Sequence, residues 1–181
     1  LNFVGREIRY QHIVAKKVIF AEGFGLKKNP YFDYLPLNGT KGELLTIYAP
    51  SLKESSVIKS SVFIIPLEDN RYRIGATYKW EDKTSIPTER SKKELLDKLK
   101  TFLRCDFEVV DHMAGIRPTV SDRRPLVGQH PNHKNLYVLN GFGSRGVLIA
   151  PFAAQQLYRF IANGKEIDPE MDIKRFEHTY G

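Results

Sequence analysis

The run Gly141-Phe-Gly-Ser-Arg-Gly-Val-Leu-Ile-Ala-Pro151 has the residue types best suited to hold a ligand. The segment before it, Asn135-Leu-Tyr-Val-Leu-Asn140, is typical of a β-strand, and apolar residues at helical spacing follow from Phe152 to Ile161. The chain is therefore expected to pass from a strand through a glycine-rich turn into a helix. Such a helix start presents free N–H groups and a positive dipole, and glycines let a flat ring or a phosphate approach closely. The run predicts a seat for an anion or a cofactor.

The same run spells G-x-G-x-x-G at Gly141, Gly143 and Gly146. In a dinucleotide-binding unit this spelling opens a βαβ motif, and a second parallel strand ends in an acidic residue. Here residues 163–169 are polar, and no apolar strand precedes Glu166. The run is therefore not expected to form an independent dinucleotide site. A glycine-rich turn without a ligand stays as the alternative.

The composition is that of a soluble globular protein. The 181 residues are 41% hydrophobic and 27% charged, which suits one domain or two small ones. No apolar stretch is long enough to cross a membrane, and the first residues do not resemble a signal peptide. Cys105 is the single cysteine, so we expect a reducing cytoplasm. The net charge of +7 admits an acidic partner, although the dispersed lysines favour a solvated surface.

Hydrophobic patterns predict a chain rich in strands. The expected strands are residues 6–12, 18–21, 42–48, 57–66, 72–80, 107–112 and 135–140. A helix is expected to start at Thr88 or Ser91, either of which can cap it. Gly115, followed by Pro118, is expected to break the strand that begins at Phe107.

The predicted fold class is α+β. An antiparallel sheet with one helix is inserted between two end pieces: a lone strand up to Gly25, and the strand and helix of residues 135–161. Neither end piece can bury its own faces, and both are expected to need a parallel sheet that the chain does not contain. The sequence therefore looks like a piece of something longer.

Four features in a fixed order carry a family resemblance. They are Val18-Ile-Phe-Ala-Glu-Gly23, Gly75-Ala-Thr-Tyr78, Gly115-Ile-Arg-Pro118 with Asp122 and Pro125-Leu-Val-Gly128, and the run 141–151. The set resembles the C-terminal part of the FAD-dependent D-amino-acid oxidase family, which includes glycine oxidase and sarcosine oxidase. The resemblance implies that residues 1–30 end a Rossmann-like FAD domain that is otherwise missing. Residues 31–112 would form a substrate-binding sheet domain, and residues 113–181 would return to the FAD domain.

The resemblance also implies the chemistry. FAD would accept a hydride from the carbon next to the nitrogen of a small amino acid or secondary amine, and no catalytic side chain is needed. The implied cofactor-binding residues are Gly23, Gly115, Ile116, Arg117, Gly141, Gly143, Ser144, Arg145, Gly146 and Val147. The family's pyrophosphate-binding G-x-G-x-x-G lies near its N-terminus and is absent here. The chain is therefore expected to need the rest of its FAD domain and to be inactive alone.

Four residues are implied in substrate binding. Arg117 matches the arginine that holds the substrate carboxylate in relatives, although an arginine paired with a nearby acid is the alternative. Phe63 and Tyr78 match residues that line the pocket, although both could be core aromatics. Ser144 stands where relatives have a second arginine, so that part of the substrate clamp differs.

Two other functions stay open. Ser144-Arg145-Gly146 is more similar to the oxidase domain of the bifunctional enzyme that modifies the wobble uridine of tRNA, and tRNA is then the partner. A binding module that kept the sheet and lost the chemistry is the other alternative. His130 and His133 have no acidic or cysteine neighbours in the sequence, so no metal site is expected.

Overall fold

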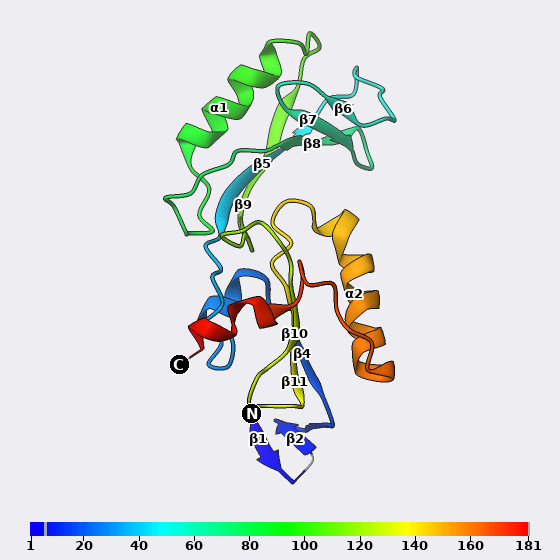
Figure 1. The fold of residues 1–181 in the computed structure, drawn as a ribbon. Helices are drawn as coiled ribbons and strands as arrows, with labels where there is room; N and C mark the ends of the chain where they lie inside the picture. Colours follow the sequence, from blue (N-terminus) through cyan, green and yellow to red (C-terminus); the bar gives the residue numbers. More distant parts are fainter. Residues whose placement is uncertain (6, 181) are drawn as a thin grey trace. The chain divides into compact units, whose positions relative to one another are not determined.

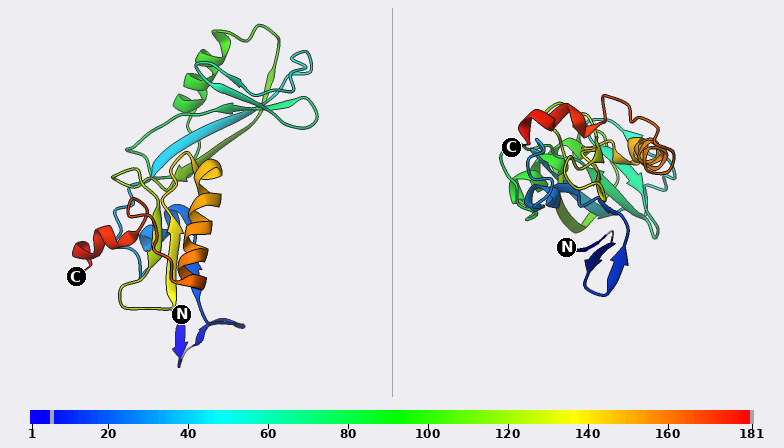
Figure 2. Two further views of the ribbon diagram at one scale, coloured as in Figure 1. Left: turned by 45° about the vertical axis from the view of Figure 1, so that its right-hand side comes forward. Right: turned by 60° about the horizontal axis from the view of Figure 1, so that its bottom comes forward.

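The computed structural model describes residues 1–5 and 7–180, and these form two compact units. The first unit joins Leu1–Gly39 to the part of the chain from Arg117 onward, and the second unit is Thr40–Ile116. Each unit has its own α-helix, α2 in the first and α1 in the second (Figure 1, Figure 2). Each unit also has its own hydrophobic core.

The first unit is built on a mixed sheet in the order β10-β11-β4. The strand β4 (Val18–Phe20) runs parallel to β11 (Leu136–Asn140), and β10 (Leu126–Gln129) runs antiparallel to β11. The expectation that the end pieces lack a parallel partner is therefore wrong, because the two pieces pair with each other. Because β4 and β11 are parallel, the segment after β4, which includes Gly23, and the turn after β11, which begins at Gly141, leave the sheet at the same edge.

Both faces of this sheet are covered. The helix α2 (Gly146–Asn163) packs on one face, where Tyr137 contacts the cluster that includes Ala153 and Leu157. On the other face Leu136 packs into a cluster with Leu26, Phe32 and Ile173. Burial on both faces explains why residues 135–140 form a nearly continuous apolar run. The 3₁₀ helices η1 (Gly23–Lys28) and η2 (Ile173–Thr179) supply part of the second cluster.

A small antiparallel sheet precedes β4. Its strands are β1 (Asn2–Val4), β2 (Glu7–Tyr10) and β3 (Ile13–Ala15), paired in that order. The prediction of a lone N-terminal strand is therefore wrong. Arg6, the first residue of the predicted strand 6–12, lies outside the described residues.

The second unit is a five-stranded sheet in the order β6-β7-β8-β5-β9, with α1 (Glu89–Lys100) on one face. The strands are β5 (Thr40–Tyr48), β6 (Ile58–Lys59), β7 (Phe63–Pro66), β8 (Arg71–Gly75) and β9 (Glu108–Arg117). Leu45, Ile64 and Ile74 are fully buried in the same cluster as Leu95 and Leu99 of α1. These residues alternate with others along their strands, so α1 covers only one face of the sheet.

Three strand predictions in this unit need correction. The strand predicted for residues 72–80 ends at Gly75, and beyond it only an isolated bridge pairs Lys79 with Lys41. Residues 57–66 form two strands, because the Ser60 N–H donates to the Val62 carbonyl (2.8 Å) in a tight turn. Gly115 does not break β9, which continues to Arg117 and ends before Pro118. Proline has no N–H to donate to a neighbouring strand, so it is the effective stop.

The coarse fold prediction is confirmed: the chain is a mixed α/β protein whose sheets are largely antiparallel. The helix start at Thr88 is also confirmed, since its hydroxyl accepts the Ser91 N–H at 3.3 Å. Ser91 lies inside the helix and is not its cap. In the part of the chain described, no helix combines the length and apolar character that crossing a membrane requires.

Candidate functional site

The glycine-rich turn joins β11 to α2. Gly141 and Gly143 have φ angles of +78° and +56°, in the left-handed region that favours glycine. A Cβ on Gly141 would lie 2.7 Å from Val120 Cγ2 and 3.0 Å from the Leu126 backbone nitrogen, whereas on Gly143 its nearest neighbour would be Thr119 Oγ1 at 3.7 Å. Gly141 is therefore required by packing inside the unit, and Gly143 borders open space.

The N-terminus of α2 is not capped by a side chain. Arg145 occupies the N-cap position and makes no capping hydrogen bond. Within residues 1–5 and 7–180, the N–H groups of Gly146 and Val147 have no acceptor. The side chain of Val147 is 93% exposed and that of Leu148 is 81% exposed, so nothing described covers this end. Two free donors and the positive end of the helix dipole favour a carbonyl oxygen or an anion here.

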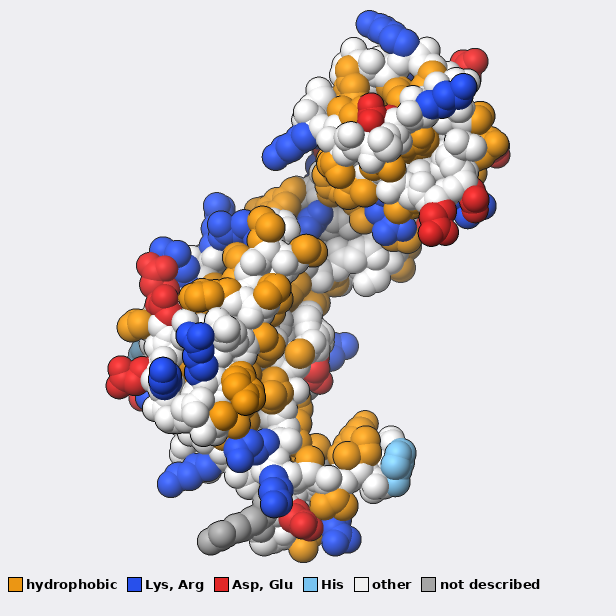
Figure 3. Space-filling view, turned by 90° about the vertical axis from the view of Figure 1, so that its right-hand side faces the viewer, with side chains coloured by type: hydrophobic (Ala, Val, Ile, Leu, Met, Phe, Trp, Pro, Cys, Tyr) orange, Lys and Arg blue, Asp and Glu red, His pale blue; other side chains and the backbone are white. Residues whose placement is uncertain are grey.

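An exposed apolar strip continues along α2. Phe152 and Tyr158 are exposed, as are Val147 and Leu148 in the first turn. Figure 3 shows hydrophobic side chains gathered over the face of the first unit that carries α2. Large apolar side chains at this density on one surface are typical of a face that contacts another molecule or domain.

Asn140 connects the ends of the two parallel strands. Its Nδ2 donates to the Gly23 carbonyl (2.9 Å), and its Oδ1 accepts the Gly141 N–H (2.8 Å). Asn140 is almost fully buried, so both bonds are shielded from water. The sequence analysis does not predict a role for Asn140. The one pattern that could have indicated it is an apolar strand that ends in an amide side chain.

The turn is also tied to the segment after β9. The Gly143 N–H donates to the Pro118 carbonyl (3.0 Å), and the Thr119 N–H donates to the Arg117 carbonyl (2.9 Å). The structure therefore brings Gly23, the Arg117 backbone and the run from Gly141 together in the first unit. Gly115 and Ile116, by contrast, belong to β9 in the second unit.

Arg145 lines a cavity of about 260 Å³ in the first unit. Arg123 and Arg124 line the same cavity, and the Arg124 guanidinium forms an ion pair with the Glu170 carboxylate at 2.8 Å. Ser144, the preceding residue, is exposed. Asp122 stabilises the turn that carries Arg123 and Arg124. Its carboxylate accepts the Arg124 backbone N–H (2.9 Å) and the Arg175 Nε–H (2.9 Å).

In the second unit Phe63 lies over a glycine. Phe63, Gly75 and Leu44 are direct cross-strand partners on β7, β8 and β5. A Cβ on Gly75 would overlap Leu44 Cδ2 and lie 2.6 Å from Phe63 Cζ. The absent side chain thus lets Phe63 lie flat on the sheet face that α1 does not cover.

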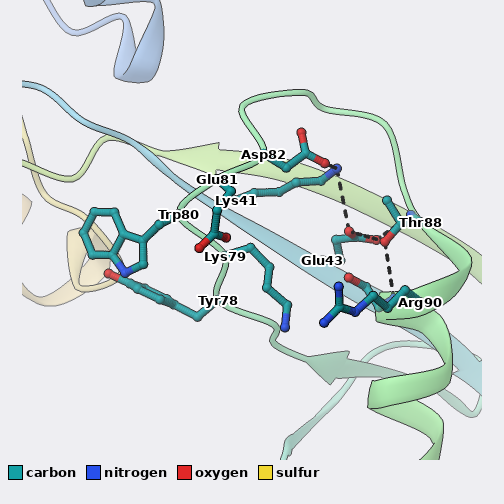
Figure 4. A pocket seen from close by; sticks show the side chains of 10 residues that line it. Lys41, Glu43, Tyr78, Lys79, Trp80, Glu81, Asp82, Thr88 and Arg90 are labelled. Atoms are coloured by element: carbon teal, nitrogen blue, oxygen red, sulfur yellow. Dashed lines mark hydrogen bonds and ion pairs between the residues drawn. The ribbon is translucent and has the colours of Figure 1, made fainter.

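Tyr78 lines a cavity of about 590 Å³ in the second unit (Figure 4). It is 46% exposed and forms an edge-to-face pair with Trp80, with 5.6 Å between ring centroids. Its backbone is held on both sides, because Thr77 and Lys79 make backbone hydrogen bonds to Glu43 and Lys41.

Two buried charges form the floor of this cavity. Lys41 and Glu43 are each 1% exposed on β5. The Lys41 ammonium donates to Asp82 (2.5 Å), to the Thr84 hydroxyl (3.2 Å) and to the Ile86 carbonyl (2.5 Å). The charge of Lys41 is therefore satisfied by residues 82–86, and Figure 4 shows the lysine side chain reaching toward Asp82. The same contact with Lys41 lowers the pKa of Asp82 to about 2.

The Glu43 carboxylate is satisfied within the chain. It accepts the Thr88 N–H (2.8 Å) and the Thr88 hydroxyl (2.9 Å), and His112 Nε2 lies 2.9 Å from it. Burial alone would raise the pKa of Glu43, but the hydrogen bonds from Thr88 and Ser91 and the Lys41 charge hold this pKa below its usual range. Because every charge on this floor has partners, the floor anchors residues 77–88 rather than offering a free ligand site.

Comparison with known proteins identifies the class. The family of FAD dependent oxidoreductases called DAO matches residues 3–159, so the chain belongs to that family. It is 27% identical to glycine oxidase of Bacillus subtilis over 163 residues, which cover 86% of this chain and 43% of the enzyme. It is 28% identical to the tRNA 5-methylaminomethyl-2-thiouridine biosynthesis bifunctional protein MnmC of Aromatoleum aromaticum, covering 88% of this chain and 28% of that protein.

A solved structure agrees with this assignment. Glycine oxidase from Geobacillus kaustophilus superimposes with a TM-score of 0.69 at 25% identity, covering 90% of this chain and 45% of the enzyme. The chain therefore spans less than half the length of these relatives. The resemblance inferred from the sequence motifs is confirmed, and FAD is the cofactor of the family.

The first unit fits a flavin. The ring carbonyls of FAD need hydrogen-bond donors and an approach free of side chains, and the α2 start has two free N–H groups beside open space at Gly143. All of the cofactor assignments, including Ser144 and Arg145, stay predictions.

Proposed function

We propose that the chain is the C-terminal portion of a FAD-dependent enzyme that oxidises a C–N bond of a small amino acid or secondary amine. The observation that carries this proposal is the open N-terminus of α2, beside a glycine turn tied to Gly23 and Pro118. Family membership supplies the reaction class, and the 27% identity to a glycine oxidase supports an amino-acid or amine substrate.

The residues of this chain mainly bind and orient. FAD, when bound, accepts the two electrons that leave the substrate as a hydride. The N–H groups of Gly146 and Val147 would stabilise negative charge on the flavin carbonyl edge, which favours the transfer. Arg117 would hold the substrate carboxylate with its planar guanidinium, while Phe63, Tyr78 and Ser144 would line the substrate. No side chain has to act as an acid or base in this scheme.

We also propose the division of labour along the chain. Residues 1–30 and 113–181 would complete a Rossmann-like FAD domain, and residues 31–112 would bind substrate. In the described residues no strand follows α2, and Asp172 makes only an isolated parallel bridge to Val127. The run 141–146 therefore does not open a βαβ unit, and another segment has to hold the FAD pyrophosphate. Residues 1–181 alone would then be inactive, and a reducing cytoplasm is the proposed location.

The test is anaerobic reduction of the flavin. The flavoprotein containing this chain, titrated with glycine or N-methylglycine, should lose its visible flavin absorbance in proportion to amine added. Arg117→Met should raise the amine concentration needed by about tenfold or more, because a charge-assisted pair is lost. Arg159→Met on the exposed side of α2 is the matched control and should change nothing. Absence of bound flavin, or of any reduction by amines, would rule the proposal out.

A tRNA-modifying oxidase of the same fold is the second candidate. The observations that favour it are the 28% identity to MnmC and the net charge of +7. This candidate predicts that the flavoprotein binds tRNA, with an affinity that falls steeply as salt rises. Small amines would then reduce the flavin poorly. A chain that binds neither flavin nor tRNA would be the non-catalytic module.

A further inference from the structure

Three arginines from two separate stretches of the chain line one cavity of the first unit, with a volume of about 260 Å³. Arg123 and Arg124 lie in the turn before β10, and Arg145 is the residue that precedes α2. Leu126, at the start of β10, is paired with Asn140, at the end of β11. The turn before β10 and the turn before α2 therefore meet at the same edge of the sheet.

The positive charge of this cavity is only partly neutralised by the chain. Arg124 forms an ion pair with Glu170 at 2.8 Å, and both side chains are exposed. Among the residues that the structure describes, the guanidinium groups of Arg123 and Arg145 form no ion pair and no hydrogen bond. The three arginines and one glutamate that line the cavity leave it with a net charge of +2.

A cluster of cations around one cavity favours an anion. Like charges that line a cavity repel one another and raise the local potential, and a bound anion relieves both. Asp122 does not do so, because its carboxylate is paired with Arg175 at 2.9 Å. A phosphate carries up to two negative charges and has oxygen atoms for more than one guanidinium, so it matches this cavity better than a single carboxylate does.

The turn itself does not need the side chain of Arg123. Its backbone has a φ angle of +59°, in the left-handed region where glycine is favoured over residues with a Cβ. The turn is closed by the backbone, since the Arg123 N–H donates to the Val120 carbonyl at 3.0 Å. A glycine could make the same turn without its guanidinium, so the contribution of this charge can be tested without disturbing the fold.

An aromatic ring borders the same cavity. Phe152, on α2, is 47% exposed, and Leu148, one turn earlier, is 81% exposed. An exposed aromatic side chain offers a flat surface on which a nucleobase can stack. The cavity thus places cations suited to a phosphate beside a surface suited to a ring, and a nucleotide joins these two groups in one molecule.

We propose that this cavity binds the phosphate of a nucleotide, with the ring of the nucleotide against Phe152. A free nucleotide and a single nucleotide of an RNA strand share this chemistry. The site lies wholly within the first unit and goes beyond the proposed amine oxidation. FAD also carries phosphates, so the nucleotide is a second ligand of the protein already loaded with FAD.

The experiment measures binding to the FAD-loaded flavoprotein that contains this chain. The probes are inorganic phosphate, uridine 5′-monophosphate and a short single-stranded oligouridylate, the last at several salt concentrations. Uridine 5′-monophosphate should bind more tightly than inorganic phosphate, because its ring adds a contact with Phe152. An oligouridylate that binds more tightly still, with an affinity that falls steeply as salt rises, identifies an RNA strand as the source of the nucleotide. Equal affinities for the two uridine probes identify a free nucleotide.

Four variants test the residues. Arg123→Gly should weaken the binding of all three probes about tenfold, because a charge-assisted contact is lost. Glu170→Gln should strengthen it about threefold, because a competing carboxylate is removed. Phe152→Ala should weaken the binding of the uridine probes and leave that of inorganic phosphate unchanged. Arg159→Met is the matched control: it removes an exposed arginine of α2 that does not line the cavity, and it should change nothing.

Several outcomes would overturn the assignment. They are no binding of any probe, unchanged binding in Arg123→Gly, and an equal loss in Arg159→Met. Loss of FAD from Arg123→Gly would also overturn it, because the arginines would then hold the cofactor. Flavin reduction by amines is a separate readout. If uridine 5′-monophosphate binds in an Arg123-dependent way and no amine reduces the flavin, the oxidase proposal fails and the site stands.

Discussion

The two α-helices of this protein begin in opposite ways. The first turn of α1 is closed by its own chain: the Thr88 hydroxyl accepts the Ser91 N–H, and Glu43 accepts the Thr88 N–H. The first turn of α2 has no side-chain cap, and its free donors face open space. A helix start that the chain itself satisfies stabilises the fold, whereas one left open beside a glycine turn has room for an outside acceptor.

The largest loss of stability is expected from a change at the N-terminus of α1. Glu43→Leu should lower the free energy of unfolding by about 4 kcal/mol, because it leaves the Thr88 N–H and hydroxyl without their carboxylate acceptor and the buried Lys41 without a nearby negative charge. Urea unfolding monitored by the fluorescence of Trp80, which lies at the same cavity, is the measurement. Asp97→Leu, which removes an exposed ion pair with Lys93, should cost less than about 0.5 kcal/mol. Equal losses in the two variants would contradict a structural role for the Glu43 network.

The second-largest effect is expected in the glycine turn that precedes α2. Gly141→Ala should lower the unfolding free energy by about 3 kcal/mol, since it adds a clash with Val120 to an unfavourable φ. Gly143→Ala has the unfavourable φ without the clash and should cost about 1 kcal/mol. Thermal unfolding of both variants measures the difference. If the two cost the same, Gly141 is not packed as the structure has it.

Exchanging the caps tests the comparison directly. Thr88→Ala should destabilise the protein by about 1 kcal/mol, because α1 loses its N-cap acceptor. Arg145→Ser should stabilise it by up to about 1 kcal/mol, because a hydroxyl would cap the open end of α2. Denaturant midpoints report both changes. A loss of stability in Arg145→Ser would mean that α2 is already capped.

The two units should also respond to acid in different ranges, with smaller effects. Burial, and then the nearby His133, lowers the pKa of His130 in the first unit from 6.5. The unfolded chain therefore binds a proton more readily than the folded one, and stability falls as the pH drops below 6.5. Glu43, whose pKa lies below its ordinary 4.5, contributes stability that is lost as the pH falls below 4.5.

Unfolding measured from pH 8 to pH 3 checks this difference. His130→Gln should flatten the upper part of the profile and leave the lower part, and Glu43→Gln should do the reverse. A single acid transition that neither substitution alters would show that other groups determine the pH dependence.

Much of the fold could be read from short patterns. Thr88, the apolar alternation of β5 and β8, and the glycine-rich turn were all recognised because each depends on neighbours within a few residues. The split of residues 57–66 into two strands was missed, because Val57 to Pro66 has the composition of one continuous strand and the Ser60–Val62 turn has no strong signature.

The candidate site divides in the same way. By itself the sequence determined where glycine is needed, which segment starts α2 and which family the ordered motifs resemble, since those features are local or linear. Only the tertiary structure decided that β4 and β11 pair in parallel, that Asn140 joins Gly23 to Gly141, and that Lys41 and Glu43 are buried together. It also decided that the Nε atom of Arg73 is buried without a hydrogen-bond partner among the described residues. Burial and pairing depend on residues distant in the chain, and no local pattern of residue types contains that information.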